Sequence, residues 1–448
     1  MRILYIIPWI PYPLSSGGAQ AFFNYADVLR HDNNTTLLLS VHNDEEDENA
    51  EKLKAVWPDV SIIKYDFRSD WEYMRLAPPH DDFSSKTRAE IKWLNKIKNS
   101  CERKINRRLN KSHKPIYLDS DSKIRLRNEV AVLYNENRDM TSGYLGFVQE
   151  VASQGFDVIQ VEFYESLPLV YVLPQDVRKI FVHHEIRFVH NDDEMRLFKQ
   201  VTAKDRYTYA TQKAMELDAL SKYDRIVVLS DVDKSIIMKY LPDADVYVSP
   251  AMTQAMVNER QELQFAPCHD LVFVGNSNHL PNVEGIMWFL TDVMPKLISC
   301  GYDGTVWVTG KWDHGIQHAM TEACNKVQFT GFVDDLQLFL NGKITLVPIR
   351  IGGGIRMKIL DSVASYSPIV STVKGCEGLP LHNSENSFVT DDADEFCQSI
   401  LRFTDDTELQ QRFATNAKDC IRTEMNPQKL LEIRKKTYED GNDSNSCI

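Results

Sequence analysis

The sequence predicts an α/β protein made of two doubly wound units, each with a parallel sheet between layers of helices. Its 448 residues exceed what one hydrophobic core usually holds. Apolar runs of four to eight residues recur between longer amphipathic stretches, the pattern of parallel strands joined by crossover helices. This series of strands restarts after a polar segment, residues 251–269, that has no strand pattern. We therefore expect two successive domains.

Thirteen apolar runs read as strands. The first unit has seven, at residues 2–7, 35–41, 61–67, 156–163, 179–186, 225–230 and 245–250. The second has six, at residues 270–276, 305–310, 327–332, 344–349, 368–372 and 387–390. Amphipathic stretches such as residues 282–301 connect them as helices. The predicted division is a first domain over 1–250, a linker over 251–269, a second domain over 270–425 and a polar, disordered tail over 440–448.

Composition and charge exclude several classes of protein. Apolar residues make up 43% and charged residues 26%, which is ordinary for a soluble globular chain. A net charge of −13 argues against a nucleic-acid binder. Eight scattered cysteines, without a C-x-x-C pair or clustered histidines, indicate a reducing compartment and disfavour a zinc site. The apolar N-terminus is broken by prolines and reads as a first strand, not a signal peptide.

The first candidate loop contains Gly17 and Gly18, between the first strand and a helix predicted from Ala19 to Leu29. In open parallel sheets ligands bind beyond the carboxyl ends of the strands. Two glycines let the backbone approach an anion at a helix N-terminus, where free N–H groups favour phosphate. The dinucleotide fingerprint G-x-G-x-x-G is absent. Taken alone, the pair fits a ligand-free connection equally well.

A second candidate loop begins with His183, His184 and Glu185, at the end of a predicted strand of the first domain. A histidine at this edge can bind a sugar hydroxyl or guide a proton. On its own, a histidine there is more often a structural hydrogen-bonding group.

The third loop places three glycines, Gly352, Gly353 and Gly354, before the cations Arg356 and Lys358. A bound diphosphate would meet backbone N–H groups, a forked guanidinium and an ammonium together. The alternative is a solvated basic start to a helix. Because cations at a helix N-terminus oppose the helix dipole, the anion site is the better interpretation.

Two acids complete this predicted edge of the second sheet. Asp361 lies about one turn beyond the cations, at a spacing that lets its carboxylate accept hydrogen bonds from ribose hydroxyls. The fourth loop follows the next strand and adds Gly375, Glu377 and Gly378.

Taken together, these residues resemble the GT-B glycosyltransferases, specifically family 4. The resemblance is strongest over residues 271–388, with "LVFVGNSNHLPNVEGIMWFL" and a GG-x-R-x-K-I-L run, and moderate over residues 1–27. It implies two Rossmann-like domains facing across a cleft, with the nucleotide sugar held mainly by the second and the acceptor by the first. It also implies a hexosyltransferase-like reaction with retention of configuration, no metal and no other cofactor. The last helix, residues 426–439, would cross back onto the first domain.

The resemblance assigns roles in the first domain. Gly17 and Gly18 match a loop close to the donor phosphates. His184, directly before Glu185, matches a His-acid site near the transferred sugar, and His183 is the alternative if the strand register is shifted by one residue.

In the second domain the match has two departures. Asp361 matches the second acid of an E-x7-E signature and would contact the ribose, but the first acid falls at Gly353. Many relatives carry an arginine and a lysine for the diphosphate after "FVG", where this chain has Asn276. We therefore predict that Arg356 and Lys358 stabilise the departing diphosphate, whose negative charge grows in the transition state. Gly354 and Glu377 complete the predicted donor site.

Two other functions are compatible with parts of the sequence. The departures fit a catalytically silent GT-B subunit that scaffolds a membrane-associated glycan assembly complex. A nicotinamide-dependent enzyme would use the same kind of sheet, but the missing G-x-G-x-x-G disfavours it. The favoured prediction is a glycosyltransferase of cell-surface polysaccharide or glycoconjugate synthesis, acting on a glycan or lipid-linked acceptor.

One basic segment stands apart in this acidic chain. Residues 86–114 carry eleven Lys or Arg against two Glu, with an apolar stripe at helical spacing. Such a helix can lie on an anionic membrane surface, which would place a cytoplasmic protein at the inner face of the cytoplasmic membrane. The alternative is an inserted helix that packs its stripe on its own domain.

Overall fold

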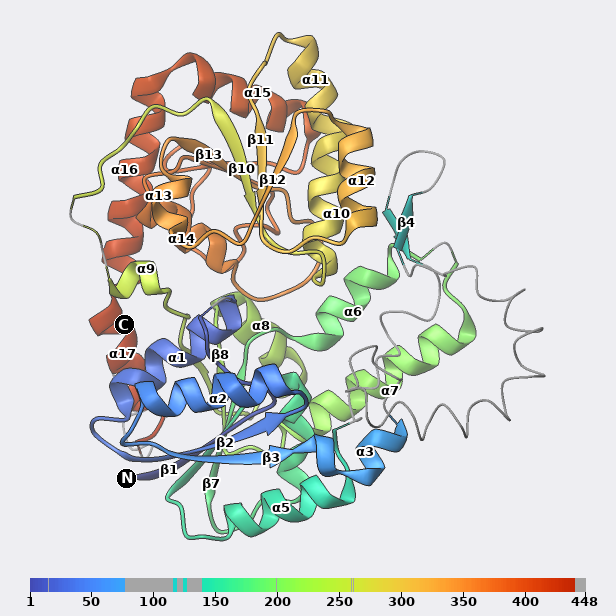
Figure 1. The fold of residues 1–448 in the computed structure, drawn as a ribbon, viewed down its shortest axis with the longest axis vertical. Helices are drawn as coiled ribbons and strands as arrows, with labels where there is room; N and C mark the ends of the chain where they lie inside the picture. Colours follow the sequence, from blue (N-terminus) through green and yellow to red (C-terminus); the bar gives the residue numbers. More distant parts are fainter. Residues whose placement is uncertain are drawn as a thin grey trace.

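The computed structural model describes residues 1–14, 16–76, 116–118, 124–126, 139–198, 200–258, 260 and 262–439. It contains two parallel sheets, each flanked by helices, that lie one above the other in Figure 1. The predicted basic insertion, 86–114, and the predicted tail, 440–448, lie outside the described residues. Among the helices of the described part, none is long and apolar enough to cross a membrane.

The first sheet has seven parallel strands in the order β3-β2-β1-β6-β7-β8-β9. Their bounds are Arg2–Ile7 (β1), Asn34–Val41 (β2), Ser61–Asp66 (β3), Val158–Glu162 (β6), Arg178–His183 (β7), Arg225–Val228 (β8) and Val246–Val248 (β9). All seven strands predicted for this half are present. The strand order reverses between β1 and β6, and ligands of open parallel sheets bind beyond the carboxyl ends of the strands at such a point.

The second sheet has six parallel strands in the order β12-β11-β10-β13-β14-β15. Their bounds are Asp270–Val274 (β10), Val306–Thr309 (β11), Val327–Gly331 (β12), Lys343–Val347 (β13), Ile369–Ser371 (β14) and Phe388–Val389 (β15). The six predicted strands of this half are also confirmed. Here the order reverses between β10 and β13, and the three-glycine loop follows β13.

Helices cover both faces of each sheet (Figure 1). Those of the first domain are α1 (Gly17–Leu29), α2 (Asp44–Val56), α3 (Trp71–Leu76), α5 (Ser142–Ala152), α6 (Arg187–Met195), α7 (Ala203–Leu220) and α8 (Asp231–Tyr240). The later helices are α9 (Gln254–Val257), α10 (Leu280–Trp288), α11 (Met294–Ser299), α12 (His314–Ala323), α13 (Leu336–Leu340), α14 (Met357–Ala364), α15 (Ala393–Asp405), α16 (Thr407–Glu424) and α17 (Pro427–Lys436). A short antiparallel hairpin joins β4 (Ile116–Leu118) and β5 (Ile124–Leu126).

The helix predicted over residues 282–301 is divided. A single π turn, Phe289–Val293, separates α10 from α11, and Pro295 lies in the first turn of α11. Because proline lacks a backbone N–H, the regular α-helical ladder is interrupted there.

The last helix, α17, lies against the first domain, beside α1 in Figure 1. The Arg434 guanidinium donates a 2.8 Å hydrogen bond to the hydroxyl of Ser249, and both side chains are buried. The hydroxyl of Tyr438 donates to the side-chain oxygen of Gln160 at 2.6 Å. The chain therefore leaves the second domain through α16, and α17 packs on the first domain.

Candidate functional site

The three-glycine loop of the second domain lies directly against the end of β7 in the first. The Gly353 N–H donates a 2.8 Å hydrogen bond to the Glu185 carboxylate. A Cβ atom on Gly354 would lie 2.4 Å from the His184 carbonyl oxygen, and Gly354 has a φ of +70°. Only glycine fits such a left-handed, tightly packed position without strain. The structure thus brings the predicted residues of the two domains together.

The imidazole of His184 is held in one orientation. Its Nε2 donates to the carboxylate of Glu162 at 2.6 Å, and the Glu162 side chain is only 1% exposed. The ring of Phe163 stacks on the imidazole with a centroid separation of 3.8 Å and an angle of 9°. Because a carboxylate accepts hydrogen bonds, Nε2 carries a proton in this contact, and Nδ1 is the ring nitrogen that Glu162 does not contact.

His183 has a different role. Its side chain is fully buried, and its Nε2 lies 2.8 Å from the carboxylate of Glu216. The same carboxylate accepts hydrogen bonds from the backbone N–H groups of Arg187 and Phe188, at the start of α6. His183 is therefore part of the structural support of α6, and His184 is the histidine at the facing ends of the domains.

Gly17 and Gly18 lie where α1 meets the second domain. A Cβ atom on Gly17 would be 2.8 Å from Cγ of Met357, the first residue of α14. One on Gly18 would be 3.2 Å from the Phe163 ring, which also contacts Trp9. Glycine is required here by close packing between the two helix N-termini, and the predicted phosphate contact remains a prediction.

Arg356 is buried and holds its own loop. Its guanidinium donates hydrogen bonds to the carbonyl oxygens of Gly353 and Gly354, and its Nε has no partner among the described residues. Burial lowers its pKa, while the charges of Glu185 and Glu377 act in the opposite direction. The guanidinium is thus enclosed at the meeting of the domains, and its Nε donor is unsatisfied.

Lys358 and Asp361 carry strongly shifted pKa values. Burial, together with the charge of Arg356, lowers the pKa of Lys358 to about 7. The Lys358 ammonium donates to the side-chain oxygen of Asn282 at 2.9 Å and lies 4.2 Å from the Phe273 ring centroid. Burial raises the pKa of Asp361 to about 7. Large pKa shifts of buried groups are typical of functional sites.

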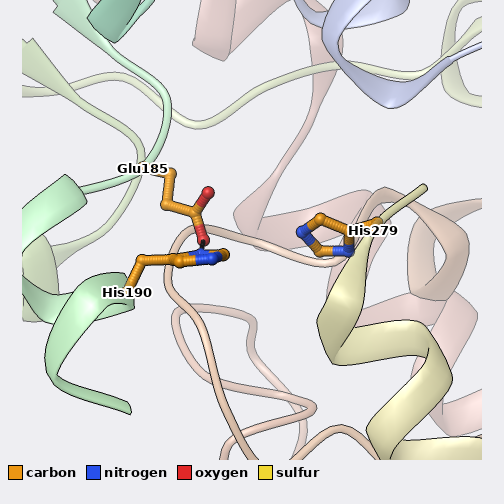
Figure 2. Close-up of side chains that lie close together, drawn as sticks. All are labelled: Glu185, His190 and His279. Carbon is orange, nitrogen blue, oxygen red and sulfur yellow. Dashed lines mark hydrogen bonds and ion pairs between the residues drawn. The ribbon is translucent and has the colours of Figure 1, made fainter. Parts of the chain in front are cut away.

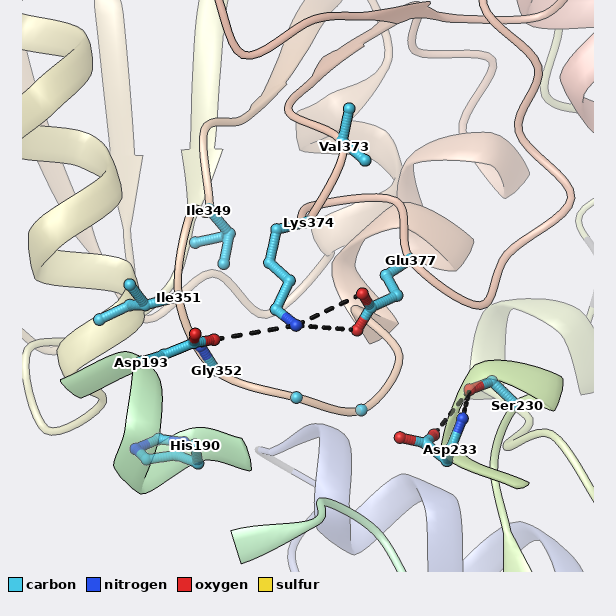
Figure 3. Close-up of polar contacts among 12 residues, drawn as sticks. His190, Asp193, Ser230, Asp233, Ile349, Ile351, Gly352, Val373, Lys374 and Glu377 are labelled. Carbon is cyan, nitrogen blue, oxygen red and sulfur yellow. Dashed lines mark hydrogen bonds and ion pairs between the residues drawn. The ribbon is translucent and has the colours of Figure 1, made fainter. Parts of the chain in front are cut away.

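Glu377 lies in the loop after β14, also at the meeting of the domains. Its carboxylate accepts hydrogen bonds from the Lys374 ammonium at 3.2 and 3.3 Å, and this ammonium lies 3.8 Å from the carboxylate of Asp193 in α6 (Figure 3). A Cβ atom on Gly378 would be 2.6 Å from the Cβ of Ser230, at the start of α8. Two loops of the second domain therefore contact the first.

Comparison with known proteins shows what the second domain and the fold are similar to. Residues 268–406 match the profile of the glycosyl transferases group 1. Structures solved for S. aureus TarM, sucrose-phosphate synthase from Thermosynechococcus elongatus and HepE from Anabaena have the same fold, each covering 98% of this chain. Residues 268–406 are therefore similar to the glycosyl transferases group 1, and the whole chain has the two-domain GT-B fold.

The structural similarities extend over almost the whole chain. The TM-score is 0.65 for TarM, 0.63 for the synthase and 0.58 for HepE, with 12% sequence identity in each case. They cover 99%, 98% and 99% of those three chains. A curated relative, an uncharacterized 44.6 kDa protein in the cps region of Klebsiella pneumoniae, is 24% identical over 263 residues. That match covers 54% of this chain and 65% of the relative, slightly less than two thirds of its length.

The structure also shows a cluster that the sequence did not reveal. Glu185, His190 and His279 each offer one ligand atom, within 4.8 Å of one another (Figure 2). His190 lies between two carboxylates, with Nδ1 2.7 Å from Glu185 and Nε2 2.7 Å from Glu194. Although burial favours a neutral ring, these carboxylates raise the pKa of His190 to about 9. The two carboxylates thus favour the protonated form of His190, and a metal ion bound here would have to displace a proton from its ring.

These partners were missed because their sequence signals are weak. Glu162 is a single acid at the end of an apolar strand, and His190 follows Glu185 by five residues. His279 is the N-cap of α10 and lies in the second domain, where burial lowers its pKa to about 4. Only folding brings the three histidines His184, His190 and His279 near the same loop.

Proposed function

We propose that this glycosyltransferase moves a sugar from a nucleoside-diphosphate donor to a glycan or lipid-linked acceptor, with retention of configuration and without a metal. The observation that carries the proposal is the contact of the three-glycine loop with His184 and Glu185. It places the predicted donor loop opposite a histidine whose orientation is fixed by Glu162.

Solved structures and the curated relative support the chemistry and the setting. HepE was crystallised with UDP and glucose, and TarM with UDP. We therefore propose a uridine diphosphate sugar as the donor. The Klebsiella relative lies in a cps region, which supports a role in cell-surface polysaccharide synthesis.

Arg356 and Lys358 are proposed to stabilise the leaving diphosphate. As the bond from the sugar to the β-phosphate breaks, negative charge grows on the phosphate, and fixed cations stabilise this transition state more than the ground state. The buried Nε donor of Arg356 has no partner among the described residues, so a phosphate oxygen would satisfy it. A diphosphate would also favour the ammonium form of Lys358, whose pKa is about 7.

His184 is proposed to orient the transferred sugar. With the proton fixed on Nε2 by Glu162, Nδ1 can accept a hydrogen bond from a sugar hydroxyl. This role requires the neutral ring.

A thermal-shift screen tests the function. UDP-sugars and GDP-sugars are added to the full chain with and without EDTA, and sugar transfer to a glycan acceptor is measured in parallel. The proposal predicts a higher melting temperature with the true donor, unchanged by EDTA, because a ligand that binds only the native state stabilises it. Failure of every donor to raise the melting temperature, together with co-purification of a second transferase, would instead favour the silent scaffold subunit suggested by Gly353.

The expected location at an anionic membrane surface is part of the proposal. Cosedimentation of the full chain with vesicles that contain anionic lipid, compared with neutral vesicles, tests it. Loss of binding at high salt is expected, because the attraction is electrostatic.

A further inference from the structure

A cavity lies beside the site described above. It has a volume of about 410 Å³ and is lined by α6, α7 and α8 of the first domain and by the loops after β13 and β14 of the second. Small-molecule pockets in proteins are typically about 300–1,000 Å³, so this cavity can hold a sugar unit. None of its lining residues was assigned a function above, apart from the contacts of Asp193 and Lys374 with the neighbouring loops.

The cavity is rich in cations, although the chain as a whole carries a net charge of −13. The cations that line it are Arg196, Lys213, Lys239, Arg350 and Lys374, against two aspartates. Three of the five are already paired with carboxylates: Arg196 with Asp192 and Asp193, Arg350 with Glu284, and Lys374 with Glu377.

Lys213 and Lys239 are the two remaining cations. The contacts that the structure shows for these two ammoniums are with aromatic side chains. The Lys213 ammonium donates a 2.9 Å hydrogen bond to the Tyr240 hydroxyl and lies 4.1 Å from the centroid of that ring. The Lys239 ammonium lies 5.9 Å from the same centroid. Two ammoniums beside one tyrosine repel each other, and a bound anion would relieve this repulsion.

Aromatic side chains complete the chemistry of the cavity. Phe188, Tyr209 and Tyr240 line it, and the rings of Phe188 and Tyr240 meet edge to face at 5.5 Å. Such rings offer an apolar surface with a polar hydroxyl at its rim, which suits the mixed apolar and polar faces of a sugar ring.

The cavity shares a wall with the proposed donor site. Asp193, which lines it, accepts a 3.1 Å hydrogen bond from the Gly352 N–H of the three-glycine loop. In Figure 3, Asp193 and Lys374 stand between this loop and the loop that carries Glu377. Since Arg350 and Lys374 come from the second domain, the cavity is complete only when both domains contribute to it.

We propose that this cavity binds the anionic part of the acceptor, a sugar that bears a phosphate or a carboxylate group. This inference rests on the proposed glycosyltransferase function and names the chemical class of its acceptor. Lys213 and Lys239 bind the oxyanion, while the aromatic side chains contact the sugar ring.

The test measures binding of three probes to the full chain by ligand-observed NMR: glucose 1-phosphate, glucuronic acid and neutral glucose. Lys213→Gln and Lys239→Ala are compared with Lys52→Ala, which removes an exposed lysine on α2 in the same domain. Lys239 is itself exposed, so its replacement leaves the fold intact. UDP binding is measured on every variant.

The expected result is binding of at least one charged probe, absence of glucose binding, and a roughly tenfold weaker affinity for the charged probe in each cavity variant, as expected for a lost charge-assisted hydrogen bond. The two charged probes distinguish a phosphorylated acceptor from a uronic acid. Lys52→Ala and the affinity for UDP should be unchanged. Equal binding of charged and neutral sugars, or unchanged affinity in both cavity variants, would overturn the inference. If the unaltered chain does not bind UDP, that result would instead contradict the proposed function.

Discussion

The N–H of Gly353, in the second domain, donates a 2.8 Å hydrogen bond to the carboxylate of Glu185, in the first. Gly353 is also the position at which the E-x7-E signature of family 4 GT-B glycosyltransferases, which this sequence resembles, would have its first acid. A Cβ atom at this position would lie 3.3 Å from Cγ of Glu185. A glutamate side chain at position 353 would therefore meet a carboxylate that is already in place. This contact explains in physical terms why the chain has no acid there.

Gly353→Glu tests this explanation. The new carboxylate would lie beside Glu185, and like charges in contact repel. We expect the free energy of unfolding to fall by about 1–3 kcal/mol, within the usual range for a destabilising substitution, and sugar transfer to fall with it. Urea denaturation provides the measurement and Gly353→Ala the control. A stabilised, more active Gly353→Glu variant would show that Glu185 does not exclude an acid.

His184→Ala and His183→Ala should differ in kind. Loss of His184 removes the proposed contact to the sugar, so transfer should fall by about 100-fold, as for loss of one fixed hydrogen-bonding group in an active site, while UDP binding and stability persist. Loss of His183 removes one of the three hydrogen bonds to the buried Glu216 carboxylate, which should cost about 1–3 kcal/mol of stability. Steady-state kinetics and denaturation of both variants distinguish the two roles. Similar losses of activity at equal stability would contradict the assignment of His184.

The pKa of Lys358, about 7, predicts a pH-dependent affinity for the donor. A diphosphate favours the ammonium form, so binding above this pKa requires proton uptake. The affinity for UDP should therefore fall as the pH rises through about 7 and beyond, by up to about tenfold per pH unit. Titration calorimetry at several pH values measures this slope. Lys358→Met should bind UDP more weakly with a flatter profile, and an equally steep profile in that variant would exclude Lys358 as the titrating group.

His190 predicts a free energy of unfolding that falls as the pH rises. Its folded-state pKa of about 9 lies above the ordinary value of 6.5, so its contribution is fully present below about pH 6.5 and is lost as the pH rises through about 9. The shift corresponds to at most about 3 kcal/mol. Because the folded-state pKa of Lys358 is lowered, its contribution to the free energy of unfolding rises with pH, whereas that of His190 falls. The difference in unfolding free energy between the unaltered chain and His190→Gln therefore isolates His190, and a difference independent of pH would refute this account.

The sheets could be predicted from sequence because parallel strands buried on both faces are continuous apolar runs, as in "RILYII" and "ITLVPI". The loops after those strands followed from the rule that ligands bind at carboxyl ends. The side-chain partners could not be predicted, since Glu162 and Glu194 are ordinary acids until the fold places them beside a histidine. Arg356 was predicted as an anion ligand, and its hydrogen bonds to two carbonyls of its own loop depend on a backbone shape that no local pattern specifies.

The most direct test of the central claim is calorimetric titration of UDP into the unaltered chain, Arg356→Ala and Arg412→Ala, with EDTA present. Arg412 is an exposed arginine on α16 and serves as the matched control. The account predicts that UDP binds the unaltered chain and Arg412→Ala equally, and at least about tenfold more weakly to Arg356→Ala, as expected for loss of a charge-assisted bond to phosphate. Equal UDP affinity in all three proteins would contradict it.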